Sequence, residues 1–458
     1  MDKIKDLTQG RITHVIGTLA APLIGASFVQ MAYSMTDMLW LGRLGSGPVA
    51  AVGAAFFFTW LNNALSYTPK IGTEITVAQS LGSGEKEQAH IYANTGAFLS
   101  IGMAIIYGMI VLVAAPWMLG IFHLTPEISA IGVDYLRWVI PGMFAGFNIN
   151  TYASVYYGAG NSRLPFRLIG LGLILNILLD PLFIFGWGSF PAMGTRGAAV
   201  ATSFSQLFVF ALFVARLYTN RSPLKKLSFF VSVKKEFVRR IVQLGLPVSL
   251  QSALFSVIGM TLGSFAARFG HVGVAVQSLG SQIEAISWMT ASGFSTALSS
   301  FVAQNYGAKL YTRIRKAYYI TLGLAGSIGL VATIGFILFP ETIFGIFISE
   351  PEALREGAIY LRIMGYSQLW MVLELVTTGG FNGVGKTLIP AYTGISLNLL
   401  RIPLSLLLMN SALGLSGIWW SITISSTLKG LVLAVWFYLG VLRPLITIRK
   451  MKQTNPAD

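Results

Sequence analysis

Residues 383–390 read GVGKTLIP, and with the three residues before them they complete a phosphate-loop template at 380–387: a glycine, four residues and Gly-Lys-Thr. Such a loop needs a β-strand before it and a helix after it, because backbone N–H groups and a helix N-terminus converge on the phosphates. The stretch therefore decides between an α/β nucleotide-binding fold and another architecture. Its flanks favour the second, because apolar stretches long enough to cross a membrane lie on both sides.

An earlier stretch is the partner of this one. Residues 158–165 read GAGNSRLP and lie 225 positions earlier (383 minus 158). The same shift aligns Pro22 with Pro247, Gly120-Ile121-Phe122 with Gly345-Ile346-Phe347, and Tyr135-Leu136-Arg137 with Tyr360-Leu361-Arg362. The chain is therefore a duplication. Because Asn161 stands in the first copy where Lys386 stands in the second, we interpret both stretches as tight connectors between membrane helices, and we expect no ATP hydrolysis.

Composition places the whole chain in the membrane. Its 458 residues are 54% hydrophobic and 11% charged, with a mean hydropathy of +0.68, whereas soluble domains carry about 25% charged residues. We predict twelve membrane-spanning helices, at roughly 14–40, 48–78, 92–116, 128–157, 164–187, 195–217, 237–264, 273–303, 317–339, 356–380, 388–410 and 415–441. The first is far longer than the core of a signal peptide, and we expect it to be retained.

The predicted fold is an all-α polytopic membrane protein of two six-helix lobes around a central cleft. Each repeat has six spans, an even number, so both copies enter the membrane in the same orientation. We predict an N-terminal lobe at 1–217, a basic cytoplasmic linker at 218–236, a C-terminal lobe at 237–441 and a cytoplasmic tail at 442–458.

The net charge of +15 has a distribution that indicates topology. Seven basic residues lie between the sixth span and the first turn of the seventh, namely Arg221, Lys225, Lys226, Lys234, Lys235, Arg239 and Arg240, whereas residues 117–127 have no Lys or Arg. Basic loops stay in the cytoplasm, so we expect both termini there and the protein in the plasma membrane or the inner membrane. The excess favours anionic lipid headgroups, and no basic stretch is interleaved with stacking aromatic residues as nucleic-acid binding requires.

Two aspartates stand out at membrane depth in the first repeat. Tyr33 and Asp37 lie one helical turn apart, and so do Asn176 and Asp180. The second repeat has Leu262 where the first has Asp37 and, after a three-residue slip that also aligns Asn176 with Asn398, Ile402 where the first has Asp180. If the acids only held helices together, both copies of the fold would be expected to keep them. We therefore favour ion or proton coupling over a packing role, although hydrogen-bonded packing remains the alternative.

The second repeat has its own intramembrane charges. Glu284 and Glu374 are candidates for meeting a cationic substrate, and Arg401 is a candidate partner for either. In the first repeat Lys70 and Glu74, four residues apart, form a candidate ion pair. Further candidates for a substrate cavity are Gln251, Trp288, Met289 and Met371, since methionine suits varied apolar ligands. The four histidines have no metal-like spacing and cysteine is absent, so we expect no metal site and no disulfide.

Taken together, these features resemble the multidrug and toxic compound extrusion transporters, and most closely their DinF-like branch. The likeness rests on twelve spans in two parallel repeats, Pro22, Thr36-Asp37 followed by Gly42, the repeated Val-Ala-Gln at 77–79 and 302–304, and Asn176 with Asp180-Pro181. The resemblance implies a cation site at Asp37, Asn150, Asn176, Asp180 and Thr202, with Tyr33 and Tyr135 near it and Pro22 as the point where the first span bends. One departure is the seventh span, where Gln251 is the only amide and there is no acid.

The resemblance implies a monomeric antiporter that exports amphipathic or cationic small molecules in exchange for H+ or Na+ by alternating access, without a cofactor. A flippase for a lipid or a lipid-linked saccharide would share the bundle and stays open as the alternative. A major-facilitator carrier is disfavoured because residues 82–90 read GSGEKEQAH, without that family's glycine-rich Asp/Arg loop. An intramembrane enzyme is disfavoured too, since no Ser/His or His/Glu cluster supplies a nucleophile and a base.

Overall fold

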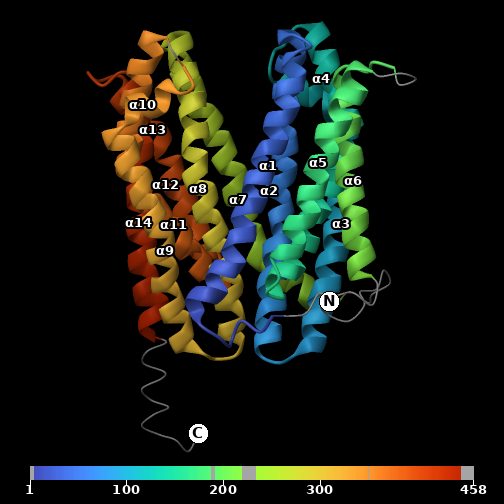
Figure 1. The fold of residues 1–458 in the computed structure, drawn as a ribbon, viewed down its shortest axis with the longest axis vertical. Coiled ribbons are helices and arrows are strands. Elements are labelled where there is room, and N and C mark those ends of the chain that lie inside the picture. Colours follow the sequence, from blue (N-terminus) through green and yellow to red (C-terminus); the bar gives the residue numbers. More distant parts are fainter. Residues whose placement is uncertain (1–4, 187–190, 219–233, 349, 445–458) are drawn as a thin grey trace, which may run out of the picture. The chain divides into compact units, whose positions relative to one another are not determined.

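The structure is a computed structural model that describes residues 5–186, 191–218, 234–348 and 350–444. Within these ranges the chain is helical and contains no β-strand. The first repeat forms α1 (Ile12–Gly42), α2 (Ser46–Gly82), α3 (Lys86–Gly120), α4 (Pro126–Gly158), α5 (Arg163–Phe185) and α6 (Thr195–Leu217), drawn from blue to green in Figure 1. Most of the predicted linker and most of the predicted tail lie outside the described residues.

The second repeat follows the same order. It forms α7 (Lys235–Ala267), α8 (Gly270–Gly307), α9 (Tyr311–Leu338), α10 (Pro340–Gly345), α11 (Pro351–Gly383), α12 (Leu388–Leu399), α13 (Arg401–Met409), α14 (Leu415–Phe437) and a terminal π-helical turn, η1 (Tyr438–Leu442). The break between α12 and α13 follows from Pro403, which has no N–H to donate to the carbonyl of Leu399. Each of the twelve predicted spans therefore coincides with a long helical segment, and the all-α membrane fold is confirmed.

The two repeats pack their helices in the same pairs. In the first, α4 contacts α2, α3 and α6; in the second, α11 contacts α8, α9 and α14. A Cβ on Gly158 would lie 2.9 Å from the carbonyl oxygen of Glu74, and one on Gly383 would lie 2.7 Å from that of Ser299. These contacts occupy equivalent positions, so the first glycine of GAGN and of GVGK serves the same close approach of two helices.

The glycines two residues later serve the turn itself. Gly160 has φ +78° and Gly385 has φ +80°, in the left-handed region that favours glycine. Lys386 donates from Nζ to the carbonyl oxygen of Gly440 at 3.0 Å, in the π-helical turn η1. The apparent phosphate loop is thus a helix–turn–helix connector with no β-strand before it, and its lysine binds the backbone of η1.

The chain divides into two compact units whose boundaries fall inside helices. Unit 1 contains residues 25–249 and unit 2 contains residues 7–24 and 250–458, while residues 1–6 are grouped with unit 1. The boundary in α1 lies between Ile24 and Gly25, and the boundary in α7 lies between Ser249 and Leu250. These two boundaries are related by the shift of the duplication. Each repeat therefore contributes the first half of its first helix to the other repeat's unit.

Specific contacts hold these half-helices. In unit 2 the Arg313 guanidinium donates to the carbonyl oxygens of Gly10 (3.1 Å from Nη1) and Gln9 (3.1 Å from Nη2). In unit 1 the rings of Phe237 and Tyr92 are 4.8 Å apart. The predicted lobe boundaries, at 217 and 237, follow the loops between helices, so they leave α1 and α7 undivided. The packing units divide both helices, and the two sets of boundaries therefore differ.

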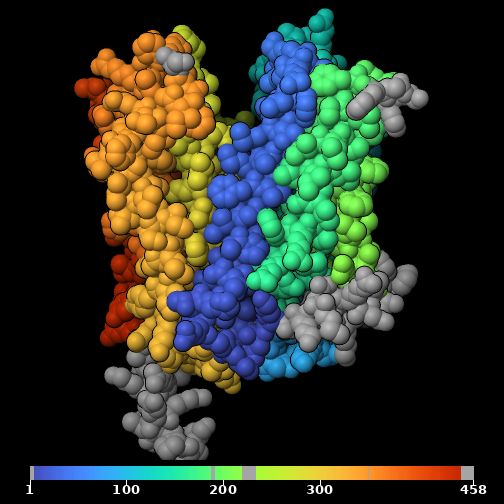
Figure 2. Space-filling view, in the orientation of Figure 1, coloured from blue at the N-terminus to red at the C-terminus, as the bar shows by residue number. Residues whose placement is uncertain are grey.

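The outer surface is apolar. Within the described ranges, nine helical segments are long and apolar enough to cross a membrane, and α4, α8 and α11 fall short of that apolarity. On α5, which lies beside α6 (both green in Figure 2), Leu171, Ile174 and Leu178 are 48%, 58% and 64% exposed. Side chains of this kind belong in lipid, and α4, α8 and α11 carry much of the polar interior instead.

Candidate functional site

The two aspartates of the first repeat meet inside unit 1. Asp37 on α1 and Asp180 on α5 lie close enough for their carboxyl groups to interact. Thr202 on α6 donates from Oγ1 to Asp37 Oδ2 at 3.4 Å, and Asn176 donates from Nδ2 to Asp180 Oδ1 at 3.0 Å, one turn along the same helix. Asp180 and Asn176 have no exposed surface. Three helices thus bring four of the predicted site residues together.

Two tyrosines complete this cluster. Tyr33, one turn before Asp37, lies near both carboxyl groups, and Tyr135 on α4 lies near both as well. Ser205 on α6 faces the Tyr33 hydroxyl. The sequence does not single out Ser205, although its spacing from Thr202, three residues on a helix, places both on one face.

The cluster contains buried oxygens that have no hydrogen-bond partner in the structure. They are Asp37 Oδ1, Asp180 Oδ2, Asn176 Oδ1 and the Tyr33 hydroxyl. Among the described residues, no lysine or arginine forms an ion pair with either carboxyl group. A buried acid that lacks a fixed counter-ion must be protonated or must bind a cation. The donor set, carboxylate, amide and hydroxyl oxygens, is the one that hard cations prefer.

Asn150 does not join this cluster through its side-chain donor. Its Nδ2 donates to Asn63 Oδ1 at 2.8 Å and to Ser66 Oγ at 2.9 Å, which ties α4 to α2. The structure describes no hydrogen bond between Asn150 and either aspartate. Pro22 lies inside α1, two residues before the chain passes from unit 2 to unit 1.

Unit 2 has a buried polar network of a different composition. Lys429 on α14 donates from Nζ to Glu374 Oε1 on α11 at 2.9 Å. Arg401 on α13 donates from Nε to Ser425 Oγ at 2.6 Å and from Nη2 to Ser426 Oγ at 3.0 Å. The Tyr360 hydroxyl donates to Glu284 Oε1.

Lys429 is not among the residues predicted from the sequence, although a lysine in the middle of the predicted span 415–441 is the signal that identifies it. The Arg401 guanidinium lies near Glu374 and Glu284 without forming an ion pair to either among the described residues. The expectation that Arg401 pairs with one of these acids is therefore wrong at the level of direct contact, because serines on α14 take its donors.

The other candidates for a substrate cavity differ in how far they are buried. Trp288 is 42% exposed, Met289 and Met371 are half-buried, and Gln251 packs against Gly394, where a Cβ would lie 2.2 Å from Nε2. A single cavity formed by these residues with Glu284 and Glu374 stays a prediction.

Lys70 interacts with an aromatic ring instead of an acid. Its ammonium lies 4.8 Å from the centre of the Tyr67 ring, and the described residues include no Lys70–Glu74 ion pair. The hypothesis of a Lys70–Glu74 pair is therefore wrong. Three residues along a helix bring Tyr67 and Lys70 onto one face, and a cation over a ring keeps its charge favourably placed.

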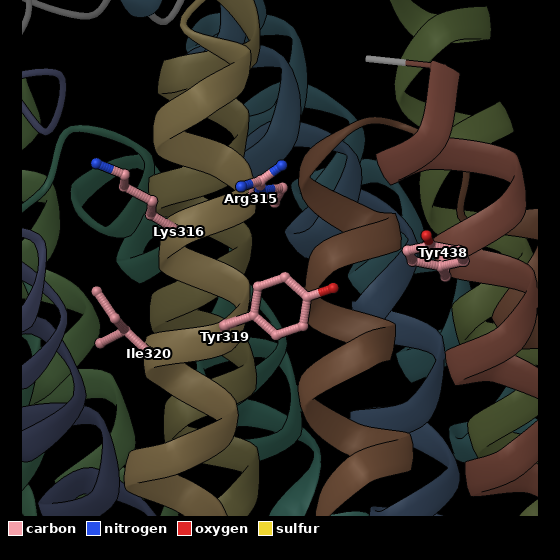
Figure 3. A pocket seen from close by; sticks show the side chains of 5 residues that line it. All are labelled: Arg315, Lys316, Tyr319, Ile320 and Tyr438. Atoms are coloured by element: carbon pink, nitrogen blue, oxygen red, sulfur yellow. The ribbon is translucent and has the colours of Figure 1, made fainter. Parts of the chain in front are cut away.

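A groove of about 470 Å³ lies elsewhere in unit 2. It is lined by Arg315, Lys316, Tyr319 and Ile320 of α9 and by Tyr438 of η1. Figure 3 shows Arg315 and the Tyr319 ring directed toward the side that carries Tyr438. Over the described ranges no group of three or more His, Asp or Glu side chains is arranged to hold a metal ion.

Comparison with known proteins matches each repeat to one family. The family model described as MatE matches residues 22–182 and 247–407. The chain is 29% identical over 412 residues to a probable multidrug resistance protein NorM of Thermotoga maritima, covering 88% of this chain and 87% of that protein. It is 23% identical over 382 residues to an FAD transporter of Shewanella oneidensis, covering 81% and 82%.

Solved structures show the same fold. A structure described as MATE in the bent conformation has a TM-score of 0.90 at 24% identity, covering 96% of this chain and 98% of that one. A structure of MATE in the straight conformation has a TM-score of 0.88 at 24% identity, with the same coverage.

Proposed function

The chain belongs to the MatE family, that of the multidrug and toxic compound extrusion transporters, and from this we propose an antiporter that exports amphipathic or cationic small molecules in exchange for H+ or Na+. Its family and its apolar helices make it a multi-pass membrane protein from a family of efflux transporters that act on small molecules. Exchange with a cation, and the site of that exchange, are the proposed parts.

The observation that carries the proposal is the buried acid pair of unit 1. Asp37 and Asp180 lie together without a basic partner among the described residues, and each keeps one buried oxygen that accepts no hydrogen bond. Two ionised carboxylates at this depth repel each other and lack hydration. Taking up H+ or Na+ removes that penalty. Release of the cation and binding of substrate are then alternatives in one conformational equilibrium.

The chain offers a bending point on the helix that carries Asp37. Pro22 interrupts the hydrogen-bond ladder of α1 close to the residue pair where the helix changes units, because proline has no N–H for the carbonyl four residues earlier. We propose that neutralisation of the acid pair biases α1 between a straighter and a more bent form at Pro22. The two solved neighbours named for straight and bent conformations are compatible with such a change.

The driving force is sufficient for export. One elementary charge that crosses 100 mV releases about 2.3 kcal/mol, which corresponds to nearly a fifty-fold concentration ratio. A single coupled cation per cycle therefore supports accumulation of substrate on one side.

The test is efflux of a fluorescent organic cation from proteoliposomes under an imposed pH or Na+ gradient. We expect the wild type to move the dye against its gradient, and Asp37→Asn and Asp180→Asn to let it only equilibrate. Asp134→Asn is the matched control, since Asp134 is a unit 1 acid that pairs with Arg196 outside the cluster. If both site variants export as well as the wild type, cation coupling at this pair is refuted. Movement of a lipid analogue without any dependence on the gradient would favour the flippase.

We further propose a location in the plasma membrane or inner membrane with both termini in the cytoplasm, a monomeric state, no cofactor, and membership of the DinF-like branch. The basic connectors support the orientation. The groove of Arg315, Lys316, Tyr319 and Tyr438 supports contact with anionic headgroups, because it joins two cations to aromatic side chains of the kind that favour the interface.

A further inference from the structure

The buried network of unit 2 lies partly on the counterparts of helices that carry the unit 1 cluster, although its Glu284 lies on α8, the counterpart of α2. Tyr360 is the counterpart of Tyr135 under the shift of the duplication, and each tyrosine lies beside buried acid. The roles of α4, α5 and α6 in unit 1 fall to α11, α13 and α14 in unit 2. Asn398 is the counterpart of Asn176, and the side-chain oxygen of each is buried without a hydrogen-bond partner.

The two clusters differ in net charge. With its acids ionised, the unit 1 cluster of described residues carries two negative charges and no positive one. The unit 2 cluster adds two cations, Arg401 and Lys429, to its two acids, so its formal charge is zero. Glu284, Glu374, Arg401 and Lys429 are 9%, 7%, 6% and 5% exposed, and at such burial charge must be balanced.

One direct ion pair contributes to this balance at Glu374, while the Arg401 guanidinium acts on both acids from a longer distance. Lys429 Nζ lies 2.9 Å from Glu374 Oε1, whereas Arg401 directs its described donors to Ser425 and Ser426 and forms no ion pair within the described part of the chain. An ammonium on a flexible stem is a compact monovalent cation, unlike the flat guanidinium. Lys429 is thus placed as an external monovalent cation would be, against a carboxylate.

We propose that unit 2 contains a monovalent-cation site, at Glu374 and its neighbours, that the Lys429 ammonium fills as a tethered cation. Removal of that ammonium opens the site to Na+ or H+. As the chain stands, only unit 1 is then available to take up a cation from solution. The tethered cation belongs to unit 2 alone and does not depend on antiport at Asp37 and Asp180.

An ordinary structural ion pair makes a different prediction. Removal of one partner of a buried pair is strongly destabilising, and replacement of both partners by neutral groups is tolerated. If Lys429 is only structural, protonation of Glu374 at acidic pH can restore part of what Lys429→Met removes, but Na+ at alkaline pH cannot. If Lys429 stands in for a cation, Na+ at alkaline pH restores it.

The experiment measures the unfolding temperature of full-length protein in lipid nanodiscs. All variants carry Asp37→Asn and Asp180→Asn, which removes the unit 1 acids. Sodium chloride is compared with choline chloride at equal ionic strength, at alkaline and at mildly acidic pH. The added substitutions are Lys429→Met, Lys429→Arg and the pair Lys429→Met with Glu374→Gln.

We expect the unfolding temperature of Lys429→Met to rise by roughly 5 to 11 °C when the cation is about a hundred-fold above its dissociation constant. Lys429→Arg and the double variant should show no such response, because the first keeps a cation and the second removes the acid. Lys429→Met that unfolds cooperatively without responding to Na+ at alkaline pH overturns the proposal, even where acidic pH stabilises it, because protonation neutralises any orphaned buried carboxylate. The proposal is also overturned if Lys429→Met fails to fold in every cation tested, whether or not the added Glu374→Gln restores folding.

The response of the protein with both unit 1 acids intact is measured in parallel. A cation response there that Asp37→Asn and Asp180→Asn abolish tests the unit 1 site. The two sites can therefore fail separately.

Discussion

Replacement of Gly245 by alanine is expected to destabilise unit 1, because α7 and α2 touch there through their backbones. A Cβ on Gly245 would lie 1.8 Å from the carbonyl oxygen of Thr68, and a Cβ on Gly72 would lie 2.3 Å from that of Ile241. The two glycines therefore form a reciprocal contact, with one on each helix. This contact attaches the first half of α7 to unit 1.

The size of the effect follows from the displacement required. Real Cβ atoms essentially never approach another atom within 3.0 Å, so α7 would have to move by at least about 1.2 Å, and overpacking of this kind costs about 1 to 3 kcal/mol. The obstacle is a backbone carbonyl, which cannot rotate away, so we expect the upper end of that range. Alanine recovers about 1 kcal/mol of helix propensity. The net loss is about 2 kcal/mol, or roughly 4 to 8 °C for a unit of this size.

Thermal unfolding in nanodiscs measures this loss, with Gly259→Ala as the matched control. Gly259 lies on the same helix, and a Cβ there would meet no atom within 4 Å beyond its own helix backbone and its two chain neighbours. That variant should be as stable as the wild type or up to about 1 kcal/mol more stable. If Gly245→Ala unfolds at the same temperature as Gly259→Ala or higher, the close approach of α7 to α2 is refuted.

Three further outcomes are expected. Asn150→Ala should lower the unfolding temperature, since two hydrogen bonds are lost at about 1 kcal/mol each. It should leave the cation dependence of efflux intact, and loss of that dependence would place Asn150 in the cation site after all. Asn176→Leu should abolish the cation dependence in the same assay, because its Nδ2 donates to Asp180 and its oxygen is free to bind, and unchanged coupling would contradict this. Arg313→Ala should speed amide hydrogen exchange at residues 7–10 several-fold relative to the control variant Arg315→Ala, since Arg313 donates hydrogen bonds to carbonyl oxygens in this segment. Equal exchange rates in the two variants would refute the anchoring role of Arg313.

Most of the fold follows from the sequence, because hydropathy and duplication report the same helices independently. The predicted span 195–217 coincides with α6, and the others differ from their helices by a few residues at either end. The sequence identifies the connector glycines as turn residues, and the structure adds their second role in helix packing. The length of each apolar stretch determines where a membrane helix begins and ends, and for this reason the helices can be predicted from the sequence.

The sequence does not reveal the exchange of half-helices. A repeat shift identifies equivalent positions, such as Pro22 and Pro247, but the same apolar face packs equally well on its own repeat or on the other one. The choice depends on matching surfaces between helices far apart in sequence. Periodicity contains no information of that kind.

The sequence predicts some contacts of the candidate site and not others, because contacts between helices far apart in sequence are again not encoded by periodicity. Spacing along one helix places Asp37 with Tyr33 and Asp180 with Asn176, and the absence of these acids in the second repeat singles out both pairs. Asn150 is grouped with them through the resemblance, whereas its rotation on α4 turns its donors toward α2. Lys429 is missed, although the cost of burying a lysine is the same signal that singles out Arg401 and the acids.

The exchanged half-helices have an evolutionary consequence. If a gene fusion of two identical six-helix subunits produced this chain, the ancestral dimer would have been held together by reciprocal arms, each subunit completing its neighbour. Neither half of the present gene, expressed alone, encodes a complete packing unit. Co-expression of the two halves, severed in the linker, would restore what each one lacks.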